Sequence, residues 1–324
     1  MKTLVTGGAG FIGSHLVDSL LKDPSRDVLV VDDFSTGSID NLPDSDRLEV
    51  VSSDIRSEPV VREAVKRVDE IYHLAAAVGV EKIVDEPLES LETNLRGTEL
   101  VLGAASTYDV PTFVASSSEV YGKDESVPFD ESDDRTLGPT ESLRWSYASA
   151  KAVDEMFALA YYEKHGLPVV VGRYFNIVGP RQSGQYGMVV PTFVEQALND
   201  EPLTVYGDGT QTRSFTHVRD AVEITRELLE TPAAHGDVYN VGSPHPTSIN
   251  DLAELVIDLA DSDSEIEHVP YEVAFDEQFE EPQQREPDVT KLERTLGWHP
   301  ETDLVRTVRD VIEERRPAEY GQVV

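Results

Sequence analysis

Residues 1–13 read MKTLVTGGAGFIG, a short apolar segment followed by a glycine-rich turn. The apolar segment, residues 2–6, has the composition of a buried strand. The glycines that follow, Gly7, Gly10 and Gly13, have the spacing at which a backbone turns tightly, approaches a pyrophosphate and packs a helix against a strand. This stretch therefore predicts a strand–turn–helix unit that binds a dinucleotide.

An acidic residue, Asp32, ends the next predicted strand, residues 27–32, about 20 residues beyond the turn. A carboxylate at this position accepts hydrogen bonds from an adenosine ribose and repels a 2′-phosphate. No arginine follows in DDFSTGS, residues 32–38. The sequence therefore favours NAD over NADP as the cofactor.

Short apolar segments alternate with longer amphipathic ones over the first two-thirds of the chain, which predicts a Rossmann-type, doubly wound parallel sheet in the α/β class. The other predicted strands are residues 48–52, 70–75, 111–116 and 168–174, and helices are expected to begin near Gly13, Glu58, Leu88 and Ser146. Residues 1–175, with 214–242 returning to them, are predicted to form the NAD-binding domain. Residues 176–213 and 243–324 are predicted to form a smaller α/β domain for the substrate, in which residues 271–287 are a loop.

The charge of the chain is extreme, because 27 Lys and Arg face 62 Asp and Glu, a net charge of −35. Such a field repels phosphate backbones, so we expect no nucleic-acid partner, and it resembles the acidic surfaces of halophilic proteins. Cysteine is absent, which excludes disulfides and thiolate metal sites, and the eight histidines lack metal-ligand spacing. No apolar run of about 18 residues occurs, so we expect a cytoplasmic protein without a membrane partner.

Tyr147 and Lys151 are four residues apart in a predicted helix and therefore lie on one face of it. A lysine ammonium beside a phenol stabilises the phenolate and moves the pKa of the tyrosine toward the range of a general base. Ser117, at the end of the preceding strand, could hydrogen-bond the same substrate oxygen. An amphipathic helix that carries Tyr and Lys by chance is the alternative, and the nucleotide-binding turn argues against it.

These motifs occur in a fixed order, from TGGAGFIG (6–13) through Asp32, Asp54-Ile55, HLAA (73–76), Asn94, SSSEVYG (116–122) and the Tyr147–Lys151 pair to RYFNIVGPR (173–181). In this order they resemble the extended short-chain dehydrogenases/reductases of the nucleotide-sugar epimerase/dehydratase group. The resemblance implies a bound NAD, a nucleoside-diphosphate sugar as substrate, and a homodimer joined through helices near 88–106 and 146–165.

The resemblance also implies roles for individual residues. Tyr147, Lys151, Ser117 and Glu119 are the expected catalytic residues. The expected NAD contacts are Gly7, Gly10, Phe11, Ile12, Gly13, Asp32, Asp33, Thr36, Gly37, Asp54, Ile55, Leu74, Ala75, Ala76, Asn94, Ser116, Tyr147, Lys151 and Tyr174. The expected substrate contacts are Ser117, Ser118, Asn176, Tyr206, Arg213, Arg285 and Asp288. For Arg213 there is an independent argument, because an acidic chain that binds a diphosphate needs fixed cations at the phosphates.

Enzymes of this group begin by oxidising the sugar at C4′, and they differ in the step that follows. Thr-Asp-Glu is typical of dTDP-glucose dehydratases, whereas this chain has Ser117-Ser118-Glu119, which disfavours dehydration. The Ser-Glu-Val-Tyr-Gly run resembles UDP-glucuronate decarboxylases, but RWSYASAK (144–151) does not resemble their usual catalytic helix. We therefore expect a UDP-glucose 4-epimerase, with decarboxylase or dehydratase as alternatives. The argument for the epimerase is that an ionised Glu119 favours a neutral C6 hydroxymethyl group.

A non-catalytic NAD-binding sensor with the same fold is the alternative from a different class. It would bind the cofactor without an absorbance change at the NADH band when sugar nucleotides are added. The intact Tyr147, Lys151 and Ser117 argue against it.

Overall fold

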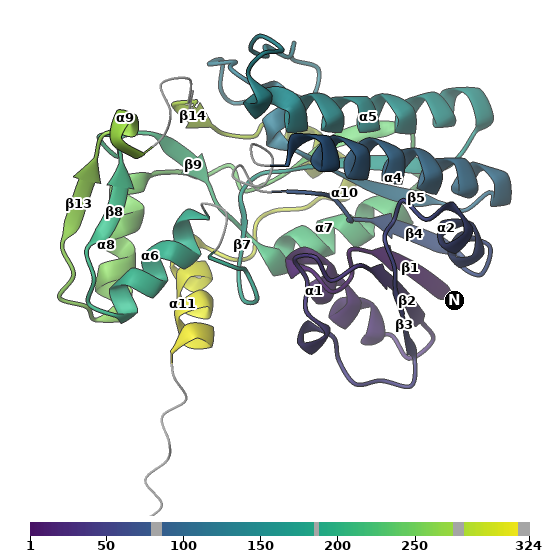
Figure 1. The fold of residues 1–324 in the computed structure, drawn as a ribbon, viewed down its shortest axis with the longest axis horizontal. Coiled ribbons are helices and arrows are strands. Elements are labelled where there is room, and N and C mark those ends of the chain that lie inside the picture. The colour runs from purple at the N-terminus through teal and green to yellow at the C-terminus, as the bar shows by residue number, and fades with distance from the viewer. Residues whose placement is uncertain (79–85, 185–187, 275–281, 317–324) are drawn as a thin grey trace, which may run out of the picture.

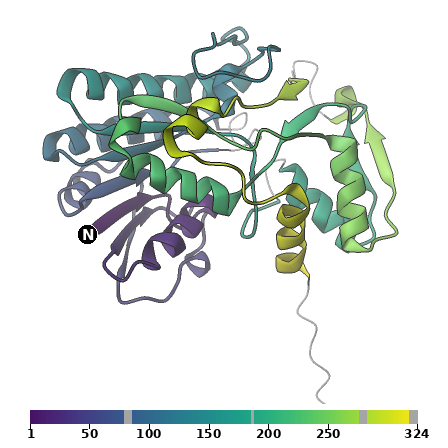
Figure 2. The same ribbon diagram turned by 180° about the vertical axis from the view of Figure 1, so that it is seen from behind.

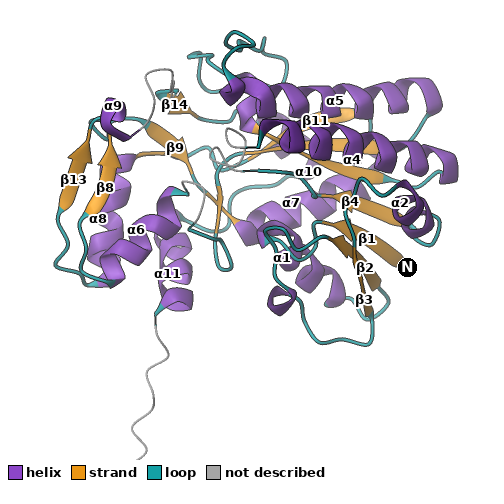
Figure 3. Ribbon diagram, in the orientation of Figure 1, coloured by secondary structure: helices purple, strands orange, loops and turns teal. Residues whose placement is uncertain are grey.

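The computed structural model describes residues 1–78, 86–184, 188–274 and 282–316. Seven strands form the central sheet in the order β11-β6-β5-β4-β1-β2-β3, and every neighbouring pair is parallel (Figures 1 and 3). Its strands are β1 (Lys2–Thr6), β2 (Asp27–Asp32), β3 (Leu48–Ser52), β4 (Glu70–His73), β5 (Thr112–Ser117), β6 (Val169–Tyr174) and β11 (Asp237–Val241). The predicted doubly wound α/β fold class is confirmed.

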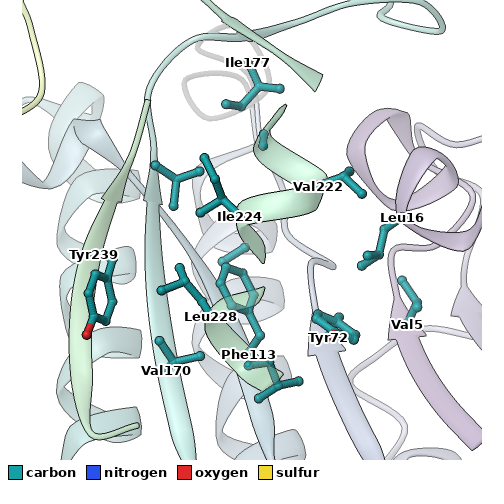
Figure 4. Close-up of a cluster of buried hydrophobic side chains, with 14 of the residues drawn as sticks. Val5, Leu16, Tyr72, Phe113, Val170, Ile177, Val222, Ile224, Leu228 and Tyr239 are labelled. Carbon is teal, nitrogen blue, oxygen red and sulfur yellow. The ribbon is translucent and has the colours of Figure 1, made fainter. Parts of the chain in front are cut away.

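Apolar side chains alternate between the two faces of this sheet because successive residues of a strand point in opposite directions. Val5 and Tyr72 belong to one buried cluster, shown in Figure 4, whereas their chain neighbours Leu4 and Ile71 belong to another on the opposite face. Helices α1 (Phe11–Leu21) and α7 (Val218–Glu230) supply residues to the first cluster. Helices α2 (Glu58–Val65), α4 (Pro87–Tyr108) and α5 (Ser146–His165) supply residues to the second. Burial on both faces explains why apolar residues fill the centres of the strands, while the polar residues lie mostly at the strand ends.

A smaller lobe, on the left in Figure 1, packs its own core between α6, α8 and α11. Its elements are β7 (Ile177–Val178), α6 (Val189–Leu198), β8 (Leu203–Tyr206), β9 (Thr212–Ser214), β10 (Thr216–His217), β12 (Pro246–Ser248), α8 (Ile249–Ala260), β13 (Ile266–Val269), α9 (Tyr271–Ala274), β14 (Gln284–Arg285) and α11 (Leu304–Arg315). Strand β8 pairs with β13, β7 with β10, and β9 lies between β12 and β14.

The chain crosses between the two lobes several times, as Figure 2 shows from behind. Helix α7 and strand β11 bring residues 218–241 back to the main sheet. Helix α10 (Thr290–Leu296) also packs there, and Val289, Leu292 and Trp298 join the core of the main sheet. The predicted limit of the smaller domain, residues 243–324, did not include this second return.

Two sequence-based expectations differ from the structure. Strand β4 ends at His73 rather than residue 75, because its register with β1 ends where Thr6 meets His73. Residues 271–287 were expected to form a loop, but they begin with the short helix α9, and Gln284–Arg285 pair with Thr212 and Arg213 of β9. Residues 275–281 of that segment lie outside the described residues. A two-residue strand leaves no periodicity in the sequence, so only its distant partner reveals it.

Over the described residues, no helix combines the length and the apolar character that a membrane crossing requires. The same residues contain no group of three or more His, Asp or Glu side chains arranged to hold a metal ion.

The charge of the chain leads to a prediction about its stability. The net charge of −35 acts against the compact state, and the Debye length falls from about 10 Å at 0.1 M salt to about 3 Å at 1 M. The melting temperature should therefore rise between dilute buffer and molar potassium chloride, as measured by scanning calorimetry. A melting temperature that is unchanged or lower in molar salt contradicts salt adaptation.

Candidate active site

A cavity of about 1740 Å³ lies where the carboxyl ends of β1, β2, β4, β5 and β6 meet the smaller lobe. Parallel strands place their carboxyl ends at one edge of a sheet, which is the usual position of a ligand site in this fold. Residues from both lobes line the cavity, from Gly7 in the first turn to Arg285 in β14.

The glycine turn forms the cofactor end of the cavity. Gly7 has a φ of 70°, and a Cβ on Gly13 would lie 2.1 Å from the Gly7 carbonyl oxygen, so neither position tolerates a side chain. Asp32 is buried beside this turn and accepts hydrogen bonds from the amides of Ala9 and Phe34, at 2.9 and 2.8 Å. Burial raises the pKa of Asp32 above its ordinary value. The turn and the carboxylate thus adjoin one end of the cavity, in the arrangement that fits a dinucleotide.

Most of the predicted site residues line this single cavity. From the expected cofactor contacts they are Gly7, Gly10, Phe11, Ile12, Gly13, Asp32, Asp33, Thr36, Ile55, Leu74, Ala75, Ala76, Ser116, Tyr147, Lys151 and Tyr174. From the expected catalytic and substrate contacts they are Ser117, Ser118, Glu119, Asn176, Tyr206, Arg213 and Arg285.

Four predicted contacts are not among the lining residues. Asp54 accepts hydrogen bonds from Arg56, so Ser53 and Ile55 face the cavity in its place. The Asn94 side chain is buried against the backbone of Ala77. Asp288 accepts from the amide of Thr290 at the start of α10.

The fourth residue, Gly37, packs against the glycine turn, and a Cβ there would lie 2.7 Å from the carbonyl carbon of Ala9. Gly37 therefore supports the glycine turn and does not line the cavity.

Tyr147 and Lys151 face the cavity from the first turns of α5, and Ser117 ends β5 opposite them. Lys151 is buried, and its Nζ donates to the Ala115 carbonyl at 3.0 Å. The sequence predicts that Lys151 lowers the pKa of Tyr147. For the protein chain without a cofactor, this prediction is wrong. Burial raises that pKa above its ordinary value, the Glu119 charge adds to the rise, and a hydrogen bond with Ser117 opposes it. Further positive charge is needed beside the phenol before it can act as a base at neutral pH.

Glu119 lies in the 3₁₀ turn Ser118–Tyr121 and is held between two arginines. Arg144 Nη1 donates to its Oε2 at 2.8 Å, and Arg285 Nη1 donates to its Oε1. Burial would raise the pKa of Glu119, but the two guanidiniums outweigh burial and hold that pKa well below its ordinary value. The carboxylate is therefore ionised, and the three side chains together carry one positive charge.

The sequence did not single out Arg144, a basic residue of RWSYASAK three positions before Tyr147. It lies in the 3₁₀ turn Leu143–Trp145 directly before α5, and its closeness in sequence to Tyr147 is the signal that could have found it. The cavity also includes Phe193, Gln211, Phe215 and Tyr271 of the smaller lobe, which the sequence did not single out. Gln211 donates hydrogen bonds to the Tyr206 carbonyl at 3.0 Å and to the Tyr271 hydroxyl at 3.1 Å.

Comparison with known families matches residues 4–311 to the family described as GDP-mannose 4,6 dehydratase. The chain belongs to this family. This family and the relatives described below belong to the extended short-chain dehydrogenases/reductases of the nucleotide-sugar epimerase/dehydratase type. The predicted resemblance is therefore confirmed.

Two relatives of this chain are similar to it over almost its whole length. The UDP-N-acetyl-alpha-D-glucosaminuronate decarboxylase of Bacillus cytotoxicus is 40% identical over 98% of both chains. UDP-glucuronic acid decarboxylase 6 of Arabidopsis thaliana is 39% identical over 94% of this chain and 85% of its own.

Solved structures of other members have the same fold. The UDP-glucose 4-epimerase of Thermotoga maritima, in complex with UDP-glucose, superposes with a TM-score of 0.88 at 30% identity, covering 97% of this chain and 98% of its own. The UDP-glucuronic acid 4-epimerase of Bacillus cereus, in complex with UDP-glucuronic acid and NAD, has a TM-score of 0.87 at 29% identity and the same coverage. The chain is therefore an enzyme of the family that contains nucleotide-sugar epimerases, dehydratases and decarboxylases.

Proposed function

We propose that this protein is an NAD-dependent decarboxylase of a UDP-linked uronic acid. The observation that carries the proposal is the position of Glu119 between Arg144 and Arg285 beside Tyr147 in the cavity. The expected preference for a neutral C6 group assumed a single carboxylate. Arg144 and Arg285 give the three-residue cluster with Glu119 a positive charge, which supports binding of a sugar carboxylate there.

The relatives support the same choice. The Bacillus cytotoxicus and Arabidopsis thaliana proteins are both named as decarboxylases of a uronic acid, and each is more similar to this chain in sequence than the two epimerases of known structure. Decarboxylation, an alternative at the level of sequence, is therefore better supported than the UDP-glucose 4-epimerase that was expected first.

NAD is the cofactor, and the residues that would hold it are those of the glycine turn, Asp32 and Lys151. Bound NAD supplies the hydride acceptor for C4′, and its positively charged oxidised ring favours the Tyr147 phenolate.

The side chains of the site can then promote the loss of carbon dioxide. Tyr147 takes the proton of the 4′-hydroxyl while NAD, when bound, would accept the hydride of C4′, and the loss of both leaves a ketone β to the C6 carboxylate. When carbon dioxide departs, the electrons of the C5–C6 bond move into an enolate at the C4′ oxygen, and a solvent proton takes the vacated position on C5. Return of the hydride to C4′ and of the Tyr147 proton to the oxygen would then give the pentose and restore the oxidised cofactor. Tyr147 and Ser117 can both donate hydrogen bonds to that oxygen. The arginines attract the C6 carboxylate, whereas the negative charge of Glu119 repels it. This repulsion ends when the carboxylate leaves as carbon dioxide.

A 4-epimerase acting on a uronic acid is the second candidate. The Bacillus cereus structure holds UDP-glucuronic acid and is named as an epimerase, so binding of the acid alone does not define the reaction. In such an enzyme the same cationic cluster would retain the carboxylate rather than release it.

The test is incubation of the purified protein, with NAD in molar salt, with UDP-glucuronate and UDP-N-acetylglucosaminuronate labelled at C6. The expected result is labelled carbon dioxide and a pentose nucleotide from at least one of them. Interconversion of UDP-glucose and UDP-galactose without carbon dioxide from either acid overturns the proposal and supports the 4-epimerase. Epimerised acid that keeps its label supports the second candidate.

The long helices α4 and α5 also suit the predicted homodimer. They pack against each other, and Leu88, Val153 and Met156 on them are exposed, with Leu88 at 75% of its surface. We propose that a second copy covers these side chains.

A further inference from the structure

Asp154 is a buried carboxylate that the reaction described above does not use. It lies on α5 one turn beyond Lys151, and its relative exposure is 0%. Its Oδ2 accepts a hydrogen bond from Lys151 Nζ at 3.3 Å, and its Oδ1 has no partner of good hydrogen-bond geometry among the described residues, although Thr98 of α4 interacts with the carboxylate and lowers its pKa. A buried carboxylate with one unsatisfied oxygen is costly for stability, so its presence beside the catalytic lysine calls for a functional explanation.

The ammonium of Lys151 is held from two sides. The carbonyl of Ala115 accepts from it across the end of β5, and Asp154 accepts from it along α5. A four-carbon stem is flexible, and two acceptors restrict the ammonium to one position. That position is one helical turn from Tyr147, where the phenolate must form.

The other titratable groups around this pair come from three elements. On α5 they are Tyr147 and Glu155, and the Glu155 carboxylate is paired with Arg173 of β6. On β4, His73 contacts the hydroxyl groups of Thr6 and Thr98, and burial, with the Lys151 charge, lowers the pKa of His73 to about 3. On the 3₁₀ turn, Glu119 is paired with two arginines. Among the residues that the structure describes, the Asp154 carboxylate forms its ion pair with Lys151 and with no other cation.

We propose that Asp154 is a positioning residue of the active site: it fixes the Lys151 ammonium against β5 and, by its own charge, sets the ionisation of Tyr147. Two effects follow from this position. The ammonium is held where the phenolate and the cofactor ribose need it. The negative charge of Asp154 also destabilises the Tyr147 phenolate. The phenolate is therefore a stronger base, which can take the substrate proton in one step and return it in a later one.

The direction of both pKa values agrees with this geometry. Burial raises the pKa of Asp154, and the charge of Lys151 opposes that rise. After burial and Glu119, the charge of Asp154 contributes to the raised pKa of Tyr147. Removal of the Asp154 charge should therefore lower the Tyr147 pKa.

The proposal rests on the Tyr147–Lys151 pair being catalytic, so the test uses a measurement that needs no sugar substrate. The NAD-bound protein, labelled with carbon-13 at the tyrosine ring carbon that bears oxygen, is titrated by NMR, and Tyr147→Phe identifies the Tyr147 signal. In Asp154→Asn the Tyr147 titration should shift to lower pH by about one unit, the low end of the effect of a nearby charge. Asp154→Glu, which keeps the charge, should return the titration toward that of the wild type.

Glu163→Gln is the matched control, because it removes the same charge from an exposed position of the same helix. It should leave the Tyr147 titration unchanged. A titration of Asp154→Asn that coincides with the wild type overturns the proposal and assigns Asp154 to the structure alone. If Asp154→Asn does not fold, Asp154→Ser is titrated in its place, and loss of folding in all three Asp154 variants also overturns the proposal. A decarboxylation assay that fails in the wild type leaves this titration intact, so the two proposals are tested separately.

Discussion

Replacement of Tyr147 by phenylalanine should leave NAD bound and lower turnover by at least ~10²-fold, the lower range for loss of a general base. The ring remains in its buried place on α5, and only the hydroxyl that exchanges a proton with the substrate is removed. Turnover is measured as carbon dioxide release from the best uronate substrate, and bound NAD by absorbance after denaturation. Near-normal turnover contradicts the assignment of Tyr147 as the base.

Lys151→Met belongs to the same experiment and should be at least as damaging. The lysine supplies positive charge beside the phenol, and its buried Nζ donates to the Ala115 carbonyl and to Asp154. Loss of the ammonium leaves the Asp154 carboxylate without its counter-ion, so this variant should also retain less NAD and be less stable. Tyr108→Phe, which removes a hydroxyl outside the cavity, is the control and should behave as the wild type.

Glu119→Gln should lower the kcat of decarboxylation by about 10²-fold without raising KM, because the change removes ground-state repulsion of the substrate carboxylate. With glutamine, Arg144 and Arg285 lose their shared anion and hold the C6 carboxylate in its place. Oxidation at C4′ precedes this step, so absorbance at the NADH band should accumulate when UDP-glucuronate is added. Stopped-flow absorbance together with carbon dioxide release measures both effects.

Glu141→Gln is the matched control for charge, because Glu141 lies at the exposed rim of the same cavity. It should change kcat little. A Glu119→Gln enzyme that releases carbon dioxide at the wild-type rate, or one that slows without accumulation of NADH, contradicts the role given to Glu119. A modest effect confined to interconversion of neutral hexose nucleotides is the pattern expected of the 4-epimerase.

The parts of the fold that could be predicted are those determined by residues close together in the sequence. Strands β1, β2 and β3 begin and end at the predicted residues, and the other predicted strands differ by one or two residues at an end. Apolar runs bounded by turns carry this information locally. Strand β14 could not be predicted, because its two residues are a strand only through pairing with β9, some 70 residues earlier.

The site was predictable to the same degree. The glycine turn, Asp32 and the Tyr147–Lys151 pair each depend on spacing within one segment, and all of them line the cavity. Asp54 and Asp288 fit their positions in the sequence equally well, yet each accepts a local hydrogen bond from the residue two positions later, Arg56 or Thr290. Spacing alone cannot tell a ligand contact from such a turn.

The sequence by itself determined the parallel sheet, the glycine turn and the helix that carries Tyr147 and Lys151, since each follows from periodicity or spacing over a few residues. The tertiary structure decided the charge around the reacting sugar. Glu119, Arg144 and Arg285 come from separate segments, and the sequence presents Glu119 as one negative charge. The fold brings both guanidiniums to it, across 25 and 166 residues. Electrostatic interaction depends on distance in space and on burial, neither of which sequence separation records, and this is why the expected substrate changed from a neutral sugar to an acid.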